Sequence, residues 1–173
     1  MSMAKGLSSG YVPIAAVAMT DRVFDALNQG GLLAHGFTYA GHPVASAVAI
    51  ANVQLMRREG IVERVRDDVG PYFRVQLEEL GRSHPIVGEI RGAGLVAGLQ
   101  LVKDKERRIL FTQEDDAAAK CRDIALANGL IMRAVNQAMI LSPPLVITRA
   151  QIDELIDKAR RSLDVTARQF GLV

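Results

Sequence analysis

Lys5 is the residue of this chain whose surroundings best suit covalent chemistry. It is the only lysine among the first 102 residues, and it precedes the loop GLSSG at residues 6–10. Glycines and serines around one lysine suit a site where backbone approaches a ligand closely and the amine is partly desolvated. Desolvation favours the neutral, nucleophilic amine that Schiff-base chemistry requires. A solvated surface lysine fits the same loop, so the loop alone leaves both interpretations open.

Thr38 is the next candidate, in the polar and aromatic stretch HGFTYAGHP at residues 35–43. A hydroxyl and loop amides ahead of a helix N-terminus are good donors to a phosphate. An N-cap or an ordinary loop hydroxyl is the alternative for Thr38. His35 and His42 do not stand at a metal-ligand spacing, so we expect structural roles for them.

Three further residues are chemically capable, but their patterns favour structural roles. Arg91 lies in EIRGAGL at residues 89–95, where we expect a bend at the glycines and a salt bridge. Arg133 ends GLIMR at residues 129–133, and its spacing alone indicates a surface arginine on a hairpin. Cys121, the single cysteine, is expected to be a small buried hydrophobe rather than a reactive thiol.

The composition is that of a globular protein with a real core. Of the 173 residues, 49% are hydrophobic and 23% charged, and the net charge is +2. The sequence has no Trp and no basic stripe interleaved with aromatics, which argues against nucleic-acid binding. It has neither a signal-peptide pattern at residues 1–10 nor an apolar run of the ~18–20 residues that span a bilayer. We therefore expect a cytoplasmic setting.

The expected elements fall into two parts, divided near residues 57–60. In the first, residues 12–19 read as a buried strand of the parallel-sheet type, and Thr20 or Asp21 begins a helix that ends before Gly30. A second helix at residues 44–55 is apolar nearly all round, which is typical of a buried helix. One strand and two helices cannot cover these surfaces, so we expect further chain before Met1 or a partner.

The second part is predicted to be α+β, with a small antiparallel sheet covered by helices. An amphipathic helical stretch at residues 62–80 should kink at Gly70-Pro71. Strands are expected at residues 86–90 and 95–102, and a hairpin at 130–133 and 139–141, with a helix from about Thr112 to Gly129 between them. Thr148 and Gln151 form a capping box that begins a last helix.

These motifs together resemble class III pyridoxal-phosphate aminotransferases, in particular the ω-amino-acid:pyruvate branch. SMAKGLSSGYVPI at residues 2–14 resembles the family's cofactor-lysine segment, HGFTYAGHP its phosphate loop, and EIRGAGL a stretch of its small domain. GLIMR and SPPLVIT at residues 142–148 resemble its carboxy-terminal signature. The likeness covers nearly all of the chain, which corresponds to well under half of a complete family member.

The resemblance implies specific roles for four residues. Lys5 would be the catalytic Schiff-base lysine that holds pyridoxal 5'-phosphate and shuttles the proton during transfer. Phe37 and Thr38 would bind the cofactor, with Thr38 reaching the phosphate of the neighbouring subunit. Arg133 would bind a substrate carboxylate and move away for an apolar amine, a task that suits the planar guanidinium. No metal is implied.

The resemblance also implies a fold, partners and an activity. Residues 1–57 would end the large α/β domain of a fold type I transferase, and residues 58–173 would form the small carboxy-terminal α+β domain. The complete enzyme, a homodimer or tetramer, would move an amino group between an amine or ω-amino acid and a keto acid such as pyruvate. The family's phosphate cup, stacking aromatic and pyridine-nitrogen aspartate precede its lysine, so we expect this chain alone to be inactive.

Two departures and three alternatives remain open at this stage. Met139-Ile140-Leu141 stands where the ornithine and γ-aminobutyrate branches usually place an arginine, which favours the ω-amino-acid or amine branch. Asn136-Gln137 replaces the family's usual Gly-Asp turn. The chain could instead be a non-catalytic fragment or module, or part of an aminomutase or a decarboxylating transaminase on the same scaffold.

Overall fold

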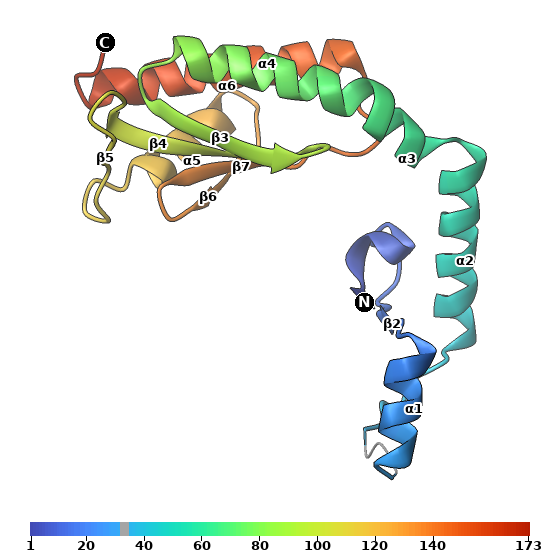
Figure 1. Ribbon diagram of the computed structural model, residues 1–173. Helices are drawn as coiled ribbons and strands as arrows, with labels where there is room; N and C mark the ends of the chain where they lie inside the picture. Colours follow the sequence, from blue (N-terminus) through green and yellow to red (C-terminus); the bar gives the residue numbers. More distant parts are fainter. Residues whose placement is uncertain (32–34) are drawn as a thin grey trace. The chain divides into compact units, whose positions relative to one another are not determined.

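The computed structural model describes residues 1–31 and 35–173 (Figure 1). Contacts between Cα atoms divide the chain into two compact units, a first unit at Met1–Gly60 and a second unit at Ile61–Val173. No helix in the described part of the chain is long and apolar enough to cross a membrane.

The first unit has short strands and two helices. Its elements are β1 (Ser2–Met3), a 3-10 helix η1 (Lys5–Ser8), β2 (Ala16–Val17), α1 (Asp21–Gln29) and α2 (Pro43–Arg58). Strands β1 and β2 pair antiparallel, with Ser2 opposite Val17, and the N-terminal ammonium of Met1 donates to the Ala18 carbonyl. This pairing closes the segment that carries Lys5 into a loop.

The buried strand predicted at residues 12–19 is wrong in length, pairing and burial. Only Ala16 and Val17 are extended in a ladder, and their partner strand is antiparallel. Val17 and Met19 are 67% and 44% exposed. Pro13 cannot donate to a ladder, and the described residues of the first unit supply no long strand beside it, so the apolar run is left without the neighbours that a parallel strand needs.

Both helices of the first unit form where predicted, but neither is covered within it. Thr20 is the N-cap of α1, and Gly30 is its C-cap. No residue of α1 is buried, and Ala49 is the one buried residue of α2. Helix α2, apolar nearly all round, instead contacts the η1 turn. Its exposed apolar faces fit the expectation that the first part does not bury its own surface.

The second unit is an antiparallel sheet with helices. Its elements are α3 (Ile61–Arg64), a π-helical turn η2 (Val65–Val69), α4 (Gly70–Ser83), β3 (Val87–Ala93), β4 (Val96–Asp104), β5 (Ile109–Leu110), α5 (Ala117–Ala127), β6 (Arg133–Val135), β7 (Ala138–Leu141) and α6 (Arg149–Gln169). The strand order is β3-β4-β7-β6, with β5 pairing β4. Helix α4 contacts β3, α5 contacts β6 and β7, and α6 packs on both helices (Figure 1).

The core of the second unit lies between this sheet and its helices. In β4, Ala97, Leu99 and Leu101 are buried while Val96 is exposed, which is the alternation of a sheet with one covered face. The largest fully buried side chains come from η2, α4, the sheet, α6 and the residues just before β3 and β6: Val69, Phe73, Leu77, Leu80, Ile86, Leu99, Leu101, Met132, Met139, Leu141, Ile152 and Leu163. The sheet therefore presents one packed face and one open face.

The expected kink at Gly70-Pro71 takes the form of a π-helical turn just before these residues. Val65–Val69 has the wider i→i+5 winding, and α4 resumes at Gly70. A Cβ at Gly70 would lie 2.3 Å from the Val65 carbonyl oxygen, so only glycine permits this close approach. The proline fits because the first turn of a helix needs no hydrogen bond from its nitrogen.

The helix predicted from about Thr112 begins later, at Ala117. Asp115 accepts hydrogen bonds from both the backbone N–H and the hydroxyl of Thr112, at 2.6 and 2.8 Å. The ammonium of Lys103 and these bonds from Thr112 lower the pKa of Asp115 to about 2. This side-chain turn occupies the residues that would otherwise have started the helix.

The other expected features of the second unit are present. The hairpin forms from β6 and β7, and Asn136 at its turn has a left-handed φ of 51°. The Thr148 hydroxyl accepts from the Gln151 N–H while the Gln151 side chain accepts from the Thr148 N–H, which completes the capping box of α6.

Candidate functional site

Lys5 lies at the start of a strained turn. It opens the 3-10 helix η1 with a positive φ of 52°, and Ser9 closes the turn with a φ of 50°. Left-handed backbone costs roughly 1–2 kcal/mol for a residue with a Cβ. The Lys5 side chain is exposed, and its ammonium forms no hydrogen bond or ion pair with residues that the structure describes. The turn therefore presents a free amine from a constrained backbone.

Asn52 of α2 ties this turn to the helix. Its Nδ2 group donates to the carbonyl of Gly6 at 2.9 Å and to that of Leu7 at 3.1 Å. Its Oδ1 accepts from the hydroxyl of Ser9 at 2.7 Å. Sequence reasoning missed Asn52, although a polar amide after the apolar run Val48–Ala51 is the signal that could have identified it.

Ser8 closes the turn from the inside. Its side chain is 1% exposed, and its hydroxyl donates to the Val12 carbonyl at 2.7 Å. Backbone bonds from Leu7 to Ala4 and from Tyr11 to Ser8 complete the network. Both serine hydroxyls of the loop thus donate a hydrogen bond within the first unit, Ser8 to a backbone carbonyl and Ser9 to the Asn52 side chain.

Phe37 and Thr38 lie in an exposed turn just before α2. The Ala40 N–H donates to the Phe37 carbonyl at 2.8 Å, and the Phe37 ring is 72% exposed. The N-cap of α2 is His42, whose Nδ1 accepts from the Ala45 N–H at 3.4 Å. The N-cap alternative for Thr38 is therefore wrong, and its hydroxyl makes no hydrogen bond within the described part of the chain.

This donor set fits a covalently held pyridoxal phosphate. The Lys5 amine is exposed and unpaired among the described residues, and the carbonyls of the two residues that follow Lys5 are held by Asn52. The Thr38 hydroxyl is exposed in a turn ahead of a helix N-terminus, where a phosphate finds N–H and O–H donors. Lys5, Phe37 and Thr38 all belong to the first unit, but no recorded hydrogen bond joins the Lys5 turn to the Thr38 turn.

Arg133 lies in the second unit, at the start of strand β6. It pairs with Ile140 of β7, and its side chain is exposed with no ion pair to a described residue. Its neighbour Met132 is 2% exposed and belongs to the core. An edge strand whose preceding residue is anchored in the core can hold a guanidinium that is free to move.

Arg91 and Cys121 have the structural roles that the sequence indicated. Arg91 lies in β3 with its Nε 3.6 Å from a carboxylate oxygen of Glu89. Cys121 is fully buried, and burial raises the pKa of its thiol to about 11, although a hydrogen bond with Thr166 opposes the shift. A thiol so rarely ionised is a poor nucleophile.

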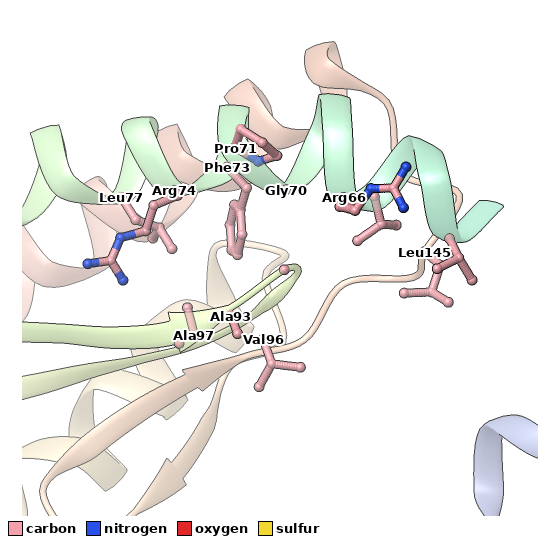
Figure 2. A pocket seen from close by; sticks show the side chains of 14 residues that line it. Arg66, Gly70, Pro71, Phe73, Arg74, Leu77, Ala93, Val96, Ala97 and Leu145 are labelled. Carbon is pink, nitrogen blue, oxygen red and sulfur yellow. The ribbon is translucent and has the colours of Figure 1, made fainter. Parts of the chain in front are cut away.

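One hollow of the second unit is lined mainly by apolar residues. It is a groove of about 810 Å³ between α4 and the β3–β4 turn, into which Phe73 projects (Figure 2). Arg66 and Arg74 are the only charged residues along it. Within residues 1–31 and 35–173, no cluster of three or more His, Cys, Asp or Glu side chains could hold a metal ion.

The sequence matches one family and several of its members. The family profile described as Aminotransferase class-III matches residues 1–163. The chain is 52% identical over 167 residues to putrescine–pyruvate aminotransferase of Pseudomonas aeruginosa, covering 96% of this chain and 36% of that protein. It is 34% identical to diaminobutyrate–2-oxoglutarate transaminase of Halomonas elongata, covering 95% and 36%. The chain thus spans about a third of the length of these relatives.

Solved structures of transaminases resemble it equally well. A transaminase from directed evolution by ancestral reconstruction has a TM-score of 0.92 at 38% identity, covering 97% of this chain and 38% of that one. The PMP-bound form of an aminotransferase from Vibrio fluvialis has a TM-score of 0.89 at 32% identity, covering 98% and 38%. The chain shares the mixed helix and sheet content of these fold type I enzymes. With its family profile matched over residues 1–163, this chain belongs to the class III aminotransferases.

Proposed function

We propose that this chain supplies the lysine-bearing part of a pyridoxal-phosphate-dependent transaminase. The enzyme would move an amino group between an amine or ω-amino acid and a keto acid such as pyruvate. The observation that carries the proposal is the free Lys5 amine on a strained turn held by Asn52. A relative 52% identical, named putrescine–pyruvate aminotransferase, supports an amine donor and pyruvate as acceptor.

Lys5 would do the central chemistry. Its Nζ would hold the cofactor through a covalent bond to the aldehyde carbon, formed with loss of water. When free, the same amine would accept and return the proton of the substrate carbon that bears the amino group. Bound pyridoxal phosphate supplies an electron-withdrawing ring that makes this proton removable. A short, constrained turn would limit the positions that Nζ can occupy, which would be the contribution of geometry to the rate.

Phe37 and Thr38 would hold the cofactor. The exposed Thr38 hydroxyl and the loop amides beside it are suited to donate to a phosphate, across a subunit interface as the family likeness implies. A homodimer or tetramer is therefore part of the proposal. The exposed Phe37 ring would pack against the same group. A cytoplasmic location completes this assignment.

Arg133 would contribute to substrate specificity. An exposed guanidinium at the edge of β6 can form two parallel hydrogen bonds with the carboxylate of a keto acid or amino acid. It can stay in solvent when the donor is a neutral amine. Residues 1–57 would then end the large cofactor-binding domain, and residues 58–173 would form the small carboxy-terminal domain with its antiparallel sheet.

Borohydride reduction of the cofactor-loaded protein, followed by peptide mapping, tests the proposal. Reduction makes the lysine–cofactor bond permanent, and we expect the label on Lys5. The other four lysines of the chain serve as internal controls: Lys103, Lys105, Lys120 and Lys158. A label on any of these instead of Lys5, or retention of the label by Lys5→Ala, would refute the assignment.

A further inference from the structure

We infer that Asn52 is a positioning residue for the Lys5 amine, an inference that rests on the function proposed above. The side chain of Asn52 forms three hydrogen bonds with the residues that directly follow Lys5. No other side chain of α2 donates to or accepts from this turn among the described residues. The Asn52 amide therefore holds the backbone next to Lys5, and with it the direction in which the Lys5 side chain leaves the turn.

The chemistry of the turn requires an amide at this position. The carbonyls of Gly6 and Leu7 need a group with two N–H donors, whereas the Ser9 hydroxyl needs an acceptor. A carboxamide offers both from one planar group. An aspartate would place negative oxygen against two carbonyls, and a leucine would fill the space without any hydrogen bond. The orientation of the Asn52 amide is fixed by these partners.

The bonds act where the backbone is least stable by itself. Lys5 and Ser9 both have left-handed φ angles, and the N-cap of η1, Ala4, offers no side-chain bond. A single 3-10 turn has few internal hydrogen bonds to keep such a conformation. Without Asn52, the turn is expected to relax toward ordinary backbone, and the four-carbon lysine side chain would start in another direction.

The test separates positioning from folding through the rate at which Lys5 bonds to added pyridoxal phosphate. Visible absorbance follows the reaction, and borohydride labelling identifies the lysine. The variants are Asn52→Leu, Asn52→Asp and Ser9→Ala. Gln54→Ala is the control, because the Gln54 side chain is exposed on the same helix and forms no hydrogen bond with a described residue. The melting temperature of each cofactor-free protein is the parallel structural readout.

We expect Asn52→Leu and Asn52→Asp to slow attachment about ten-fold or more, because each loses the two bonds to carbonyls. Ser9→Ala loses one bond and should slow it about two- to three-fold. Gln54→Ala should match the unmodified protein, and the melting temperatures should stay close. If Asn52→Leu does not fold, the attachment rates of the other two variants decide the question, and Asn52→Asp should be the slower one.

Attachment at the unmodified rate in both Asn52 variants overturns the inference. So does a slowing that is matched by a loss of melting temperature in every variant, since Asn52 would then only support the fold. Failure of the proposed function is a different result, in which the unmodified protein carries no label on Lys5 at all.

Discussion

Nε2 of His84 lies 3.3 Å from Oδ1 of Asp164, yet the imidazole is 3% exposed and the carboxylate 44%. The Nδ1 atom of His84 accepts from the Ile86 N–H, so the proton of the neutral ring belongs on Nε2. Burial lowers the pKa of His84, Asp164 opposes that shift, and Arg160 and Lys105 add to it. The ring is thus kept neutral beside a carboxylate that could pair with its charged form.

This arrangement predicts that acid destabilises the second unit. Below a pH of about 6.5 the unfolded chain binds a proton that folded His84 resists, so the free energy of unfolding falls as the pH falls. His84→Asn keeps an acceptor for Ile86 and should flatten this slope. Urea unfolding at about pH 5 and about pH 7.5 measures it. His35→Asn is the control, because His35 is exposed. If the free energy of unfolding of His84→Asn depends on pH as strongly as that of the unmodified protein, His84 is not the cause of the acid sensitivity.

Residues 1–173 produced alone are expected to show no measurable transaminase activity. These residues span only 36% of the length of the 52% identical putrescine–pyruvate aminotransferase, so groups that the rest of such an enzyme supplies to the cofactor would be missing from this preparation. The assay supplies pyridoxal phosphate, putrescine or a β-amino acid, and pyruvate, and measures alanine. Steady alanine formation above a cofactor-only control would contradict this expectation.

Arg133→Ala in the active enzyme should penalise acidic substrates selectively. A charge-assisted contact is worth roughly 1.5–3 kcal/mol, which is about ten- to a hundred-fold in kcat/KM. We expect that loss for pyruvate and for carboxylate-bearing donors, and almost none in the half-reaction with a neutral amine. Each half-reaction must be measured separately, because a full cycle always passes through the keto acid.

Arg91→Ala is the matched control for Arg133, since Arg91 is a strand arginine paired with Glu89 on its own strand. It should leave both half-reactions unchanged. Equal losses for acidic and neutral donors in Arg133→Ala would show that Arg133 supports the hairpin rather than the substrate.

Gly70→Ala is expected to destabilise the second unit by about 1–3 kcal/mol, the usual range for overpacking. The new Cβ would meet backbone, the Val65 carbonyl oxygen, at 2.3 Å. Gly81→Ala in the same helix is the control, because its Cβ would meet side-chain atoms of Ile90 and Val87 and no backbone, and the nearest of these atoms, Cδ1 of Ile90, can rotate away. Urea unfolding compares the two. A Gly70 variant as stable as the Gly81 variant would mean that the π-helical turn adapts at little cost.

The sequence predicted best where local rules decide the structure. The capping box at Thr148 and Gln151 and the hairpin around Asn136 depend on residues a few positions apart, and both form. The late start of α5 shows the limit, because the Asp115 side chain competes with the helix for its first turn. Hydrophobic periodicity does not predict such a competition, because it takes no account of hydrogen bonds between side chains and backbone.

The strand predicted at residues 12–19 failed for a different reason. An apolar run forms a strand only when neighbours accept its hydrogen bonds, and sequence alone does not say which neighbours are present. At the candidate site, Lys5 and Thr38 were proposed from their loops together with the family resemblance, and their roles stay predictions. Asn52 was not proposed, because its partners lie more than 40 residues away, at Gly6 and Leu7.

The position of Asn52 beside the Lys5 turn depends on the number of residues that separate it from the start of α2 at Pro43. One residue inserted between the two would rotate Asn52 by about 100° around the helix axis, away from the Lys5 turn. Inserting about four residues would nearly restore the angle but would move the amide roughly 6 Å along the axis. Insertions and deletions in this segment should therefore be tolerated far less than substitutions of its exposed side chains.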